Sequence, residues 1–380
     1  MQYREYGKTG KKISVLGFGG MRLPDDDQEA YLLVRRACEG GINYFDTAPS
    51  YCGWRSESII GQAVKDAKKK VFLANKSMVD YDPAAGDLRK RLEISLKNMQ
   101  AEKIDFYSMW DVSSWEKFER VTKKGGPYDG ALKAKKEGLI AHITLSSHAD
   151  SLTIKRMLES GFFEGVTLGY NLINADYRQG AIAFAAAKAI AVVTMNSLAG
   201  GVIPRIREHL DRAYVKNKLS SIAVALKFIL MTPGITSALS GMNNIRELEE
   251  NLSVIDGEIN CDAGQAEAIK KTAESLGHRF CTYCWYCLPC PKNIPLPQYL
   301  SAWNILRLEG EASAREFIYD NIVGLKNMGG LAKDCTACGS CTSKCTQKLD
   351  CVSILKEMGR GYDKFIEAER IKKNNPKSCK

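Results

Sequence analysis

The chain has 380 residues, of which 45% are hydrophobic and 26% charged, enough apolar material for two or three domains or for one large barrel with an appendix. Its formal net charge is +10, but the basic runs at 68–70 and 372–373 are short, which argues against the dense basic surface of a nucleic-acid-binding protein. The most apolar stretch, residues 181–195, is too short to cross a membrane and contains Lys188.

Eight short runs of strand-forming residues alternate with segments of helical periodicity. The expected strands lie at 13–19, 42–46, 71–76, 104–110, 139–146, 165–171, 190–196 and 235–241. Helical segments such as 29–41, 56–69 and 87–99 lie between them. This alternation predicts parallel strands joined by crossover helices, most simply a (β/α)8 TIM barrel, in which catalytic residues lie just after the carboxyl ends of the strands.

The second and third expected strands end in residues that suit acid–base chemistry. Asp46 and Tyr51 lie at the end of the second strand, and Lys76 ends the third. The ordinary pKa of a tyrosine is near ~10; a neighbouring lysine favours the phenolate, and an aspartate orients that lysine. The three residues therefore suit a proton donor to a carbonyl group, although an ion pair beside a packed tyrosine explains the pattern equally well.

The first 255 or so residues resemble the aldo/keto reductase family. The matching segments lie in order along the chain: GFGGMRLP at 17–24, GINYFDTAPSY at 41–51, the strand that ends at Lys76, HITLSSH at 142–148 and GITSALSGMNNIRELEENL at 234–252. The resemblance implies a TIM barrel with a nicotinamide cofactor across its C-terminal face. It also assigns Asp46, Tyr51 and Lys76 to three of the family's four catalytic positions.

The fourth catalytic position differs from the family pattern. The family usually has a histidine that helps to hold the substrate oxygen, whereas this chain reads IDFYSMW and has Trp110. An indole N–H can donate one hydrogen bond but cannot exchange a proton. Losing an oxyanion-type donor costs about 3–4 kcal/mol of transition-state stabilisation, which argues against simple aldehydes and ketones as substrates. Trp110 is expected either to form an aromatic wall for a flat substrate or to line the pocket without a catalytic role.

The resemblance also implies a nicotinamide site. The family's cofactor positions fall on Gly20, Met21, Ser146, Ser147, Thr167, Met195, Glu247 and, at the adenine end, Glu250 and Asn251. Ser146 and Ser147 match the segment that holds the carboxamide, whereas Thr167 replaces a common glutamine and Met195 a common aromatic residue. Glu247 stands where many members have an arginine for the 2′-phosphate of NADP, so NADH is favoured over NADPH.

Two cysteine motifs follow the expected barrel. The first is C-x2-C-x2-C-x2-C-P, with Cys281, Cys284, Cys287 and Cys290, and the second is C-x2-C-x2-C-x3-C, with Cys335, Cys338, Cys341 and Cys345. Thirteen cysteines without an export signal predict a reducing, cytoplasmic compartment, where clustered thiols bind metal more often than they form disulfides.

This spacing predicts two 4Fe–4S clusters with interleaved ligands. In two-cluster ferredoxins the fourth ligand comes from the other motif, so Cys345 would complete the cluster of the first motif and Cys290 that of the second. Zinc is the alternative, although zinc sites usually use C-x2-C pairs separated by a longer loop. The first motif has one residue fewer than a ferredoxin before its fourth cysteine, and Thr346 stands where ferredoxins usually have proline.

These features predict a barrel at 1–260, a small, mostly helical ferredoxin-like domain at 275–360 with one or two helices at 298–327, and a basic C-terminal tail at 361–380. The second segment resembles the ferredoxin-like extension of one branch of aldo/keto reductases. The expected protein is an iron–sulfur oxidoreductase that reduces a carbonyl or unsaturated small molecule with electrons from NAD(P)H, the clusters or both.

Nicotinamide transfers two electrons together, whereas each cluster passes one, so a flavin or a substrate that tolerates a radical would have to connect them. Two alternatives remain open. One is reduction without nicotinamide, in which a flavin takes part or a ferredoxin or other electron-transfer protein supplies electrons. The other is a non-enzymatic iron–sulfur redox sensor.

Overall fold

The computed structural model describes residues 1–205, 220–257, 280–324 and 329–374, together with residues 259, 264, 267 and 271. Its contacts divide the chain into two units, Met1–Leu198 with Tyr214–Lys271 and Ala199–Ala213 with Thr272–Lys380. The predicted boundaries at 260 and 275 lie outside the described residues.

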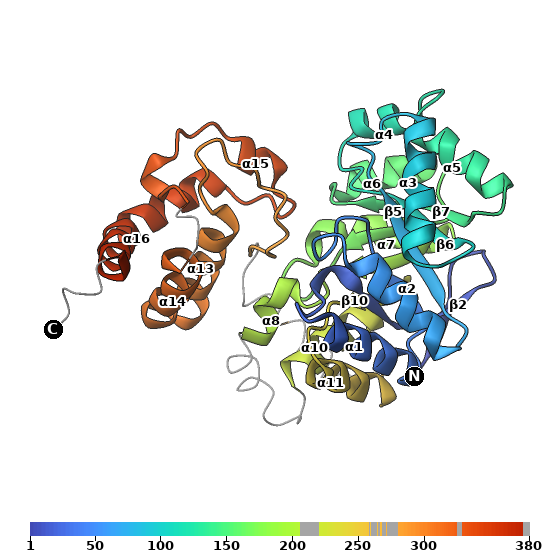
Figure 1. Cartoon of the computed structure of the whole chain (residues 1–380), viewed down its shortest axis with the longest axis horizontal. Helices are drawn as coiled ribbons and strands as arrows, with labels where there is room; N and C mark the ends of the chain where they lie inside the picture. Colours follow the sequence, from blue (N-terminus) through green and yellow to red (C-terminus); the bar gives the residue numbers. More distant parts are fainter. Residues whose placement is uncertain are drawn as a thin grey trace. The chain divides into compact units, whose positions relative to one another are not determined.

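The first unit is a closed barrel of eight parallel strands (Figure 1). The strands are β3 (Leu16–Gly19), β4 (Tyr44–Asp46), β5 (Phe72–Ser77), β6 (Ile104–Met109), β7 (Ile140–Ser147), β8 (Gly165–Gly169), β9 (Ala191–Met195) and β10 (Ile235–Ser240). Their order around the barrel is β10-β3-β4-β5-β6-β7-β8-β9. The predicted TIM barrel is confirmed, and each expected strand is present.

One expected strand, 13–19, is in fact two. Residues Lys12–Ser14 form β2, which pairs antiparallel with β1 (Tyr3–Glu5), and only Leu16–Gly19 enters the barrel as β3. Alternating apolar residues run through both pieces, so the pattern alone does not show the change of partner. Tyr6 follows β1 in the loop of this hairpin, and its side chain is fully buried.

Helices connect the barrel strands. They are α1 (Asp27–Glu39), α2 (Ser56–Ala67), α3 (Ala85–Asn98), α4 (Trp115–Thr122), α5 (Pro127–Lys136), α6 (Ser151–Glu159), α7 (Gln179–Ala187), α10 (Ser221–Met231) and α11 (Ile245–Asp256). Several begin at side chains that cap the free backbone N–H groups, for example Asp26 for α1 and Asp150 for α6. Their apolar faces pack on the strands and form the main core.

Aromatic side chains fill the amino-terminal end of the barrel. Tyr6 stacks on Phe106 with 4.0 Å between ring centroids, and Tyr44 and Phe72 complete the group. Gly165 is required here because a Cβ atom would lie 2.3 Å from the Tyr6 hydroxyl. Since this end is closed by packing, chemistry is left to the carboxyl ends of the strands.

The second unit is mostly helical. It contains α13 (Leu296–Glu309), α14 (Glu311–Ile318), the π-helical turn η5 (Tyr319–Val323), the 3-10 turn η6 (Ala332–Asp334), α15 (Ser340–Lys344) and α16 (Cys351–Asn374). The helices expected at 298–327 are α13 and α14, and residues 325–328 lie outside the described part. Its core includes Asp363, whose carboxylate accepts hydrogen bonds from the Tyr299 hydroxyl at 3.0 Å and the Lys333 N–H at 2.7 Å.

The expected basic tail at 361–380 needs correction. Helix α16 crosses residue 360 without a break, and Tyr362 and Ile366 are buried in the core of the second unit. Residues 361–374 therefore belong to the fold, because the apolar face of α16 continues past the charged residues that suggested a tail.

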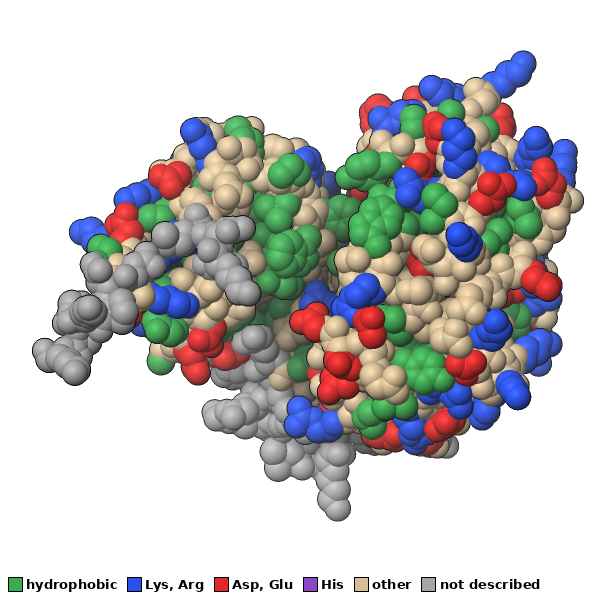
Figure 2. Space-filling model, in the orientation of Figure 1, with side chains coloured by type: hydrophobic (Ala, Val, Ile, Leu, Met, Phe, Trp, Pro, Cys, Tyr) green, Lys and Arg blue, Asp and Glu red, His purple; other side chains and the backbone are tan. Residues whose placement is uncertain are grey.

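Charged side chains of both signs are mixed over the visible face of the molecule (Figure 2). Among the described residues, no helix combines the length and the hydropathy needed to span a membrane.

Candidate functional site

Three of the predicted catalytic residues come together at the carboxyl end of the barrel. Asp46 ends β4, and Lys76 lies on the adjacent strand β5. The Lys76 ammonium donates to the Asp46 carboxylate and, at 2.8 Å, to the carbonyl oxygen of Thr47. Its Nζ atom lies 4.9 Å from the centroid of the Tyr51 ring. The strand ends thus place a fixed cation beside a phenol.

Burial decides the protonation state of this group. It raises the pKa of Tyr51 above its ordinary value of 10.0, and the opposing effect of Lys76 is smaller. Burial alone would lower the pKa of Lys76, but Asp46 and Tyr51 raise it above 10.5. The sequence predicts a proton donor whose phenolate a lysine favours; burial outweighs that lysine, so the phenol keeps its proton at neutral pH and can donate it. Proton donation is lost only as the pH rises through the raised pKa of Tyr51.

Trp110 forms a wall of the same site. It follows the last residue of β6, and its ring meets the Tyr51 ring edge-on, with centroids 5.6 Å apart and planes at 90°. Its backbone N–H donates to the Ser77 hydroxyl at 3.4 Å. The indole therefore packs on the proposed proton donor where the family usually has a histidine.

We expect Trp110→His to raise turnover of a simple aldehyde at least about tenfold, because it restores a side chain that can donate to the substrate oxygen. The measurement is kcat for a small aliphatic aldehyde under anaerobic conditions, with Trp115→His on the outer helix α4 as the matched control. Equal turnover of wild type and Trp110→His would show that the pocket differs from its relatives in more than this residue.

The residues expected at the nicotinamide ring lie on neighbouring strands. Ser146 of β7 pairs in register with Thr167 of β8, and Met195 pairs with Gly169 at the end of β9. The Ser147 hydroxyl is engaged within the protein, since it donates to the Val112 carbonyl at 2.7 Å. In contrast, Thr167 Oγ1 is buried and has no hydrogen-bond partner within the described part of the chain. A buried polar atom of this kind fits a carboxamide ligand.

Gly20 and Met21 lie on the 3-10 turn η1 (Gly20–Arg22) after β3. A Cβ atom at Gly20 would lie 2.6 Å from both the Ser56 hydroxyl and the end of the Ile60 side chain. The Gly20 carbonyl accepts hydrogen bonds from Ser56 at 2.8 Å and from the Cys52 thiol at 3.4 Å. Close packing accounts for the glycine, while the Met21 side chain is exposed.

Side chains of the helix itself accept hydrogen bonds from backbone N–H groups at the start of α11. Asn244 caps the helix by accepting from the Glu247 N–H at 3.0 Å, and the Glu247 carboxylate accepts from the Asn243 N–H at 2.8 Å. Asn251 is buried and donates to the Ser240 hydroxyl at 2.9 Å, while Glu250 is half-buried. An asparagine followed three residues later by a glutamate is a sequence signal for this helix cap. A helix start that already holds a carboxylate is a poor site for a phosphate.

The sequence analysis also missed Arg178. This arginine is fully buried, and its guanidinium donates to the carbonyl oxygens of Ala149 at 3.2 Å, Gly169 at 3.0 Å and His148 at 2.8 Å. It thereby joins the segments that follow β7 and β8. Burial and the positive charge of Arg178 lower the pKa of His148 to about 3, so this histidine stays neutral. Only the folded chain brings these distant carbonyls together.

We expect Arg178→Met to lower the free energy of unfolding of the barrel by roughly 3 kcal/mol, because three buried carbonyl groups lose their donor. Urea unfolding followed by near-ultraviolet circular dichroism measures the change. Arg89→Met, which removes ion pairs to Glu93 and Glu137 at the surface, is the control and should cost less than about 1 kcal/mol. Equal effects for the two variants would contradict this role of Arg178.

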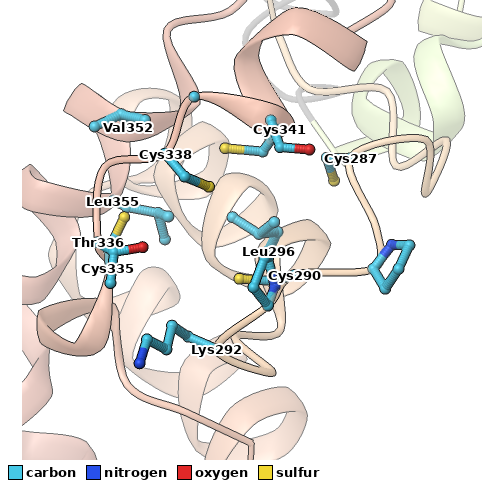
Figure 3. A pocket seen from close by; sticks show the side chains of 14 residues that line it. Cys287, Cys290, Lys292, Leu296, Cys335, Thr336, Cys338, Cys341, Val352 and Leu355 are labelled. Atoms are coloured by element: carbon cyan, nitrogen blue, oxygen red, sulfur yellow. The ribbon is translucent and has the colours of Figure 1, made fainter.

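The eight motif cysteines line two hollows in the second unit. The first hollow has about 360 Å³ and is lined by Cys290, Cys335, Cys338, Cys341 and, at its edge, Cys287. Figure 3 shows the sulfur atoms of Cys290, Cys335, Cys338 and Cys341 facing one space, although Cys290 comes from a different segment. The second hollow has about 300 Å³ and is lined by Cys281, Cys284, Cys287 and Cys345. Each hollow thus collects cysteines from both motifs.

Backbone N–H groups donate hydrogen bonds to several of these sulfur atoms. The Tyr283, Ala337 and Leu349 N–H groups donate to the sulfur atoms of Cys281, Cys335 and Cys345 at 3.4, 3.4 and 3.3 Å. Burial raises the pKa of the Cys287 thiol to about 12 and that of Cys281 further, so these thiols would be protonated without a cation. At Cys281 and Cys287, iron would supply the positive charge that a thiolate needs.

A closed parallel barrel with its reactive groups at the carboxyl strand ends places the protein among the barrel enzymes. A family model described as "Aldo/keto reductase family" matches residues 15–274, and the chain belongs to this family. A second model, "4Fe-4S dicluster domain", matches residues 280–349. The protein is therefore an oxidoreductase that carries a 4Fe–4S domain in the same chain.

Similarity to individual proteins supports the assignment to this family. L-Galactose dehydrogenase of Arabidopsis thaliana is 26% identical over 285 residues, which cover 67% of this chain and 88% of the relative. Aldo-keto reductase YhdN of Bacillus subtilis is 25% identical over 307 residues, covering 68% and 89%. The holo form of aldo-keto reductase AKR11C1 from Bacillus halodurans has a TM-score of 0.63 at 20% identity, covers 71% of this chain and 96% of its own, and shows the shared fold.

Proposed function

We propose that the protein reduces a carbonyl or conjugated unsaturated small molecule in the barrel, with Tyr51 as the proton donor. The observation that carries this proposal is the buried pair of Lys76 and Asp46 against the Tyr51 ring. Asp46 holds the Lys76 ammonium, and the ammonium stabilises the phenolate that is left when Tyr51 gives its proton to the substrate oxygen. Trp110 bounds the space beside Tyr51 and favours a flat substrate.

The nicotinamide ring would be held by Ser146, Thr167 and Met195, and the bound cofactor would supply a hydride. The unpartnered hydroxyl of Thr167 supports this assignment. Glu247 would repel the 2′-phosphate of NADPH and suits a free ribose hydroxyl, so NADH is the proposed form. Glu250 and Asn251 would face the adenine end, with Gly20 and Met21 on the neighbouring turn η1, since β3 pairs with β10 and the Asn243 amide donates to the Arg22 carbonyl.

We propose two 4Fe–4S clusters with interleaved ligands. Cys281, Cys284, Cys287 and Cys345 would hold one cluster, and Cys335, Cys338, Cys341 and Cys290 the other. A single zinc ion draws its sulfurs to about 2.3 Å from one point, and among the described residues no three His, Cys, Asp or Glu side chains form a group that could hold one metal ion. Such clusters pass one electron at a time and require a compartment that keeps thiols reduced, which supports the cytoplasm as the location.

A second candidate is reduction without nicotinamide, with electrons from a ferredoxin-like protein and with or without a flavin. It is favoured by the carboxylate of Glu247 at the start of α11, where phosphate binding would need free N–H groups. The two candidates share the same role for Tyr51.

Anaerobic purification of the full chain, followed by iron, sulfide and flavin analysis, tests the proposal. We expect about eight iron atoms per chain. Titration with NADH and NADPH, monitored by quenching of tryptophan fluorescence, should show tighter binding of NADH. No response to either nucleotide would select the second candidate, and an iron-free protein with bound zinc would contradict both.

A further inference from the structure

Thr346 lies directly after Cys345, at the position where a ferredoxin motif usually has proline. Its side chain is buried, and its hydroxyl oxygen lies 3.4 Å from the sulfur of Cys284, a cysteine of the other motif. The same oxygen accepts a hydrogen bond from the Gln347 side-chain amide at 3.1 Å. A proline at this position could make neither contact.

The direction of the contact between Thr346 and Cys284 follows from the available protons. A hydroxyl has one hydrogen, and the Gln347 amide nitrogen can only donate, so the Thr346 oxygen accepts on that side. A cysteine that binds iron is a thiolate without a proton. In the contact between these two side chains the thiolate can only accept, so the Thr346 hydroxyl is the donor to the sulfur of Cys284.

The two hollows differ in exposure. In the second hollow Cys281, Cys287 and Cys345 are each less than one-tenth exposed and Cys284 is half-buried, whereas in the first hollow Cys341 is buried, Cys290 and Cys335 are half-buried and Cys338 is exposed. Reduction adds a negative charge, which a buried, poorly solvated site disfavours. A hydrogen bond to a ligand sulfur stabilises the reduced state and opposes this effect.

We propose that Thr346 sets the reduction potential of the buried cluster by donating a hydrogen bond to the sulfur of Cys284. This inference rests on the ligand sets proposed above. The hydrogen bond would offset the effect of burial, so that a cluster held by Cys281, Cys284, Cys287 and Cys345 would be easier to reduce by one electron. Cys287 lines both hollows, which places the two sites next to each other.

Thr346→Val removes the hydroxyl at nearly constant volume, Thr346→Ser keeps it, and Thr336→Val is the matched control beside the first hollow. The anaerobic full-length protein is reduced stepwise with dithionite, and the midpoint potentials are read from EPR spectra alongside the iron content. We expect Thr346→Val to lower one of the two midpoints by about tenfold in the equilibrium constant of reduction, or about 59 mV for one electron. Thr346→Ser and Thr336→Val should keep the wild-type midpoints.

The results distinguish a failure of the proposed role of Thr346 from a failure of the proposed cluster ligands. Wild-type protein without iron would contradict the ligand sets themselves. Full iron content with unchanged midpoints in Thr346→Val would overturn the role of Thr346. If the valine variant loses iron, Gln347→Leu removes only the amide that fixes the hydroxyl, and it should lower the same midpoint by a smaller amount; an unchanged midpoint there also overturns the proposal.

Discussion

Replacing Tyr51 by phenylalanine should reduce turnover by about 100- to 10,000-fold, because the substrate oxygen loses its proton donor in the transition state. The phenyl ring can keep its edge-on contact with Trp110, so the pocket retains its shape. KM should therefore change little, and the loss should appear in kcat. Steady-state kinetics with an aromatic aldehyde or enone under anaerobic conditions measures both parameters.

Tyr31→Phe is the matched control for this experiment. Tyr31 lies on the outer helix α1 and donates to Asp66 at 3.0 Å, far from the proposed chemistry. Its loss should leave kcat unchanged. Full activity of Tyr51→Phe would argue against proton donation by this residue, and the Lys76–Asp46 pair would then only support the fold.

Replacing Cys345 by alanine should remove the cluster of the first motif, lowering iron from about eight to about four atoms per chain. The reason is that Cys345 lines the hollow of Cys281, Cys284 and Cys287 and is absent from the lining of the other hollow. Iron analysis and EPR spectra of the remaining cluster measure the effect. Cys38→Ala, in the barrel core, is the control and should keep the full iron content.

Double variants distinguish interleaved ligands from separate motifs. With interleaving, adding Cys281→Ala to Cys345→Ala removes no further iron, whereas adding Cys338→Ala removes the rest. Separate motifs predict the reverse. The buried Cys351 thiol lies near the Cys341 carbonyl and could replace a lost ligand, so Cys351→Ala is combined with each variant.

The barrel and its extension could be predicted from the residues alone. Strand and helix periods are local properties, and eight of them in alternation leave few folds other than a parallel barrel. The position of Asp46, Tyr51 and Lys76 at strand ends follows from the same pattern. The cysteine spacing is also local, because three thiols at intervals of three suit one cluster.

Properties that depend on residues far apart in the chain emerge only when it folds. Burial, rather than Lys76, sets the proton on Tyr51, since desolvation sums over many surrounding groups. Arg178 became important because folding brings three carbonyl groups of separate segments to one guanidinium. Folding also brings Cys345 to the cysteines of the first motif and Thr346 to Cys284. The helices between the two motifs set these distances, which cannot be read from the spacing of the cysteines.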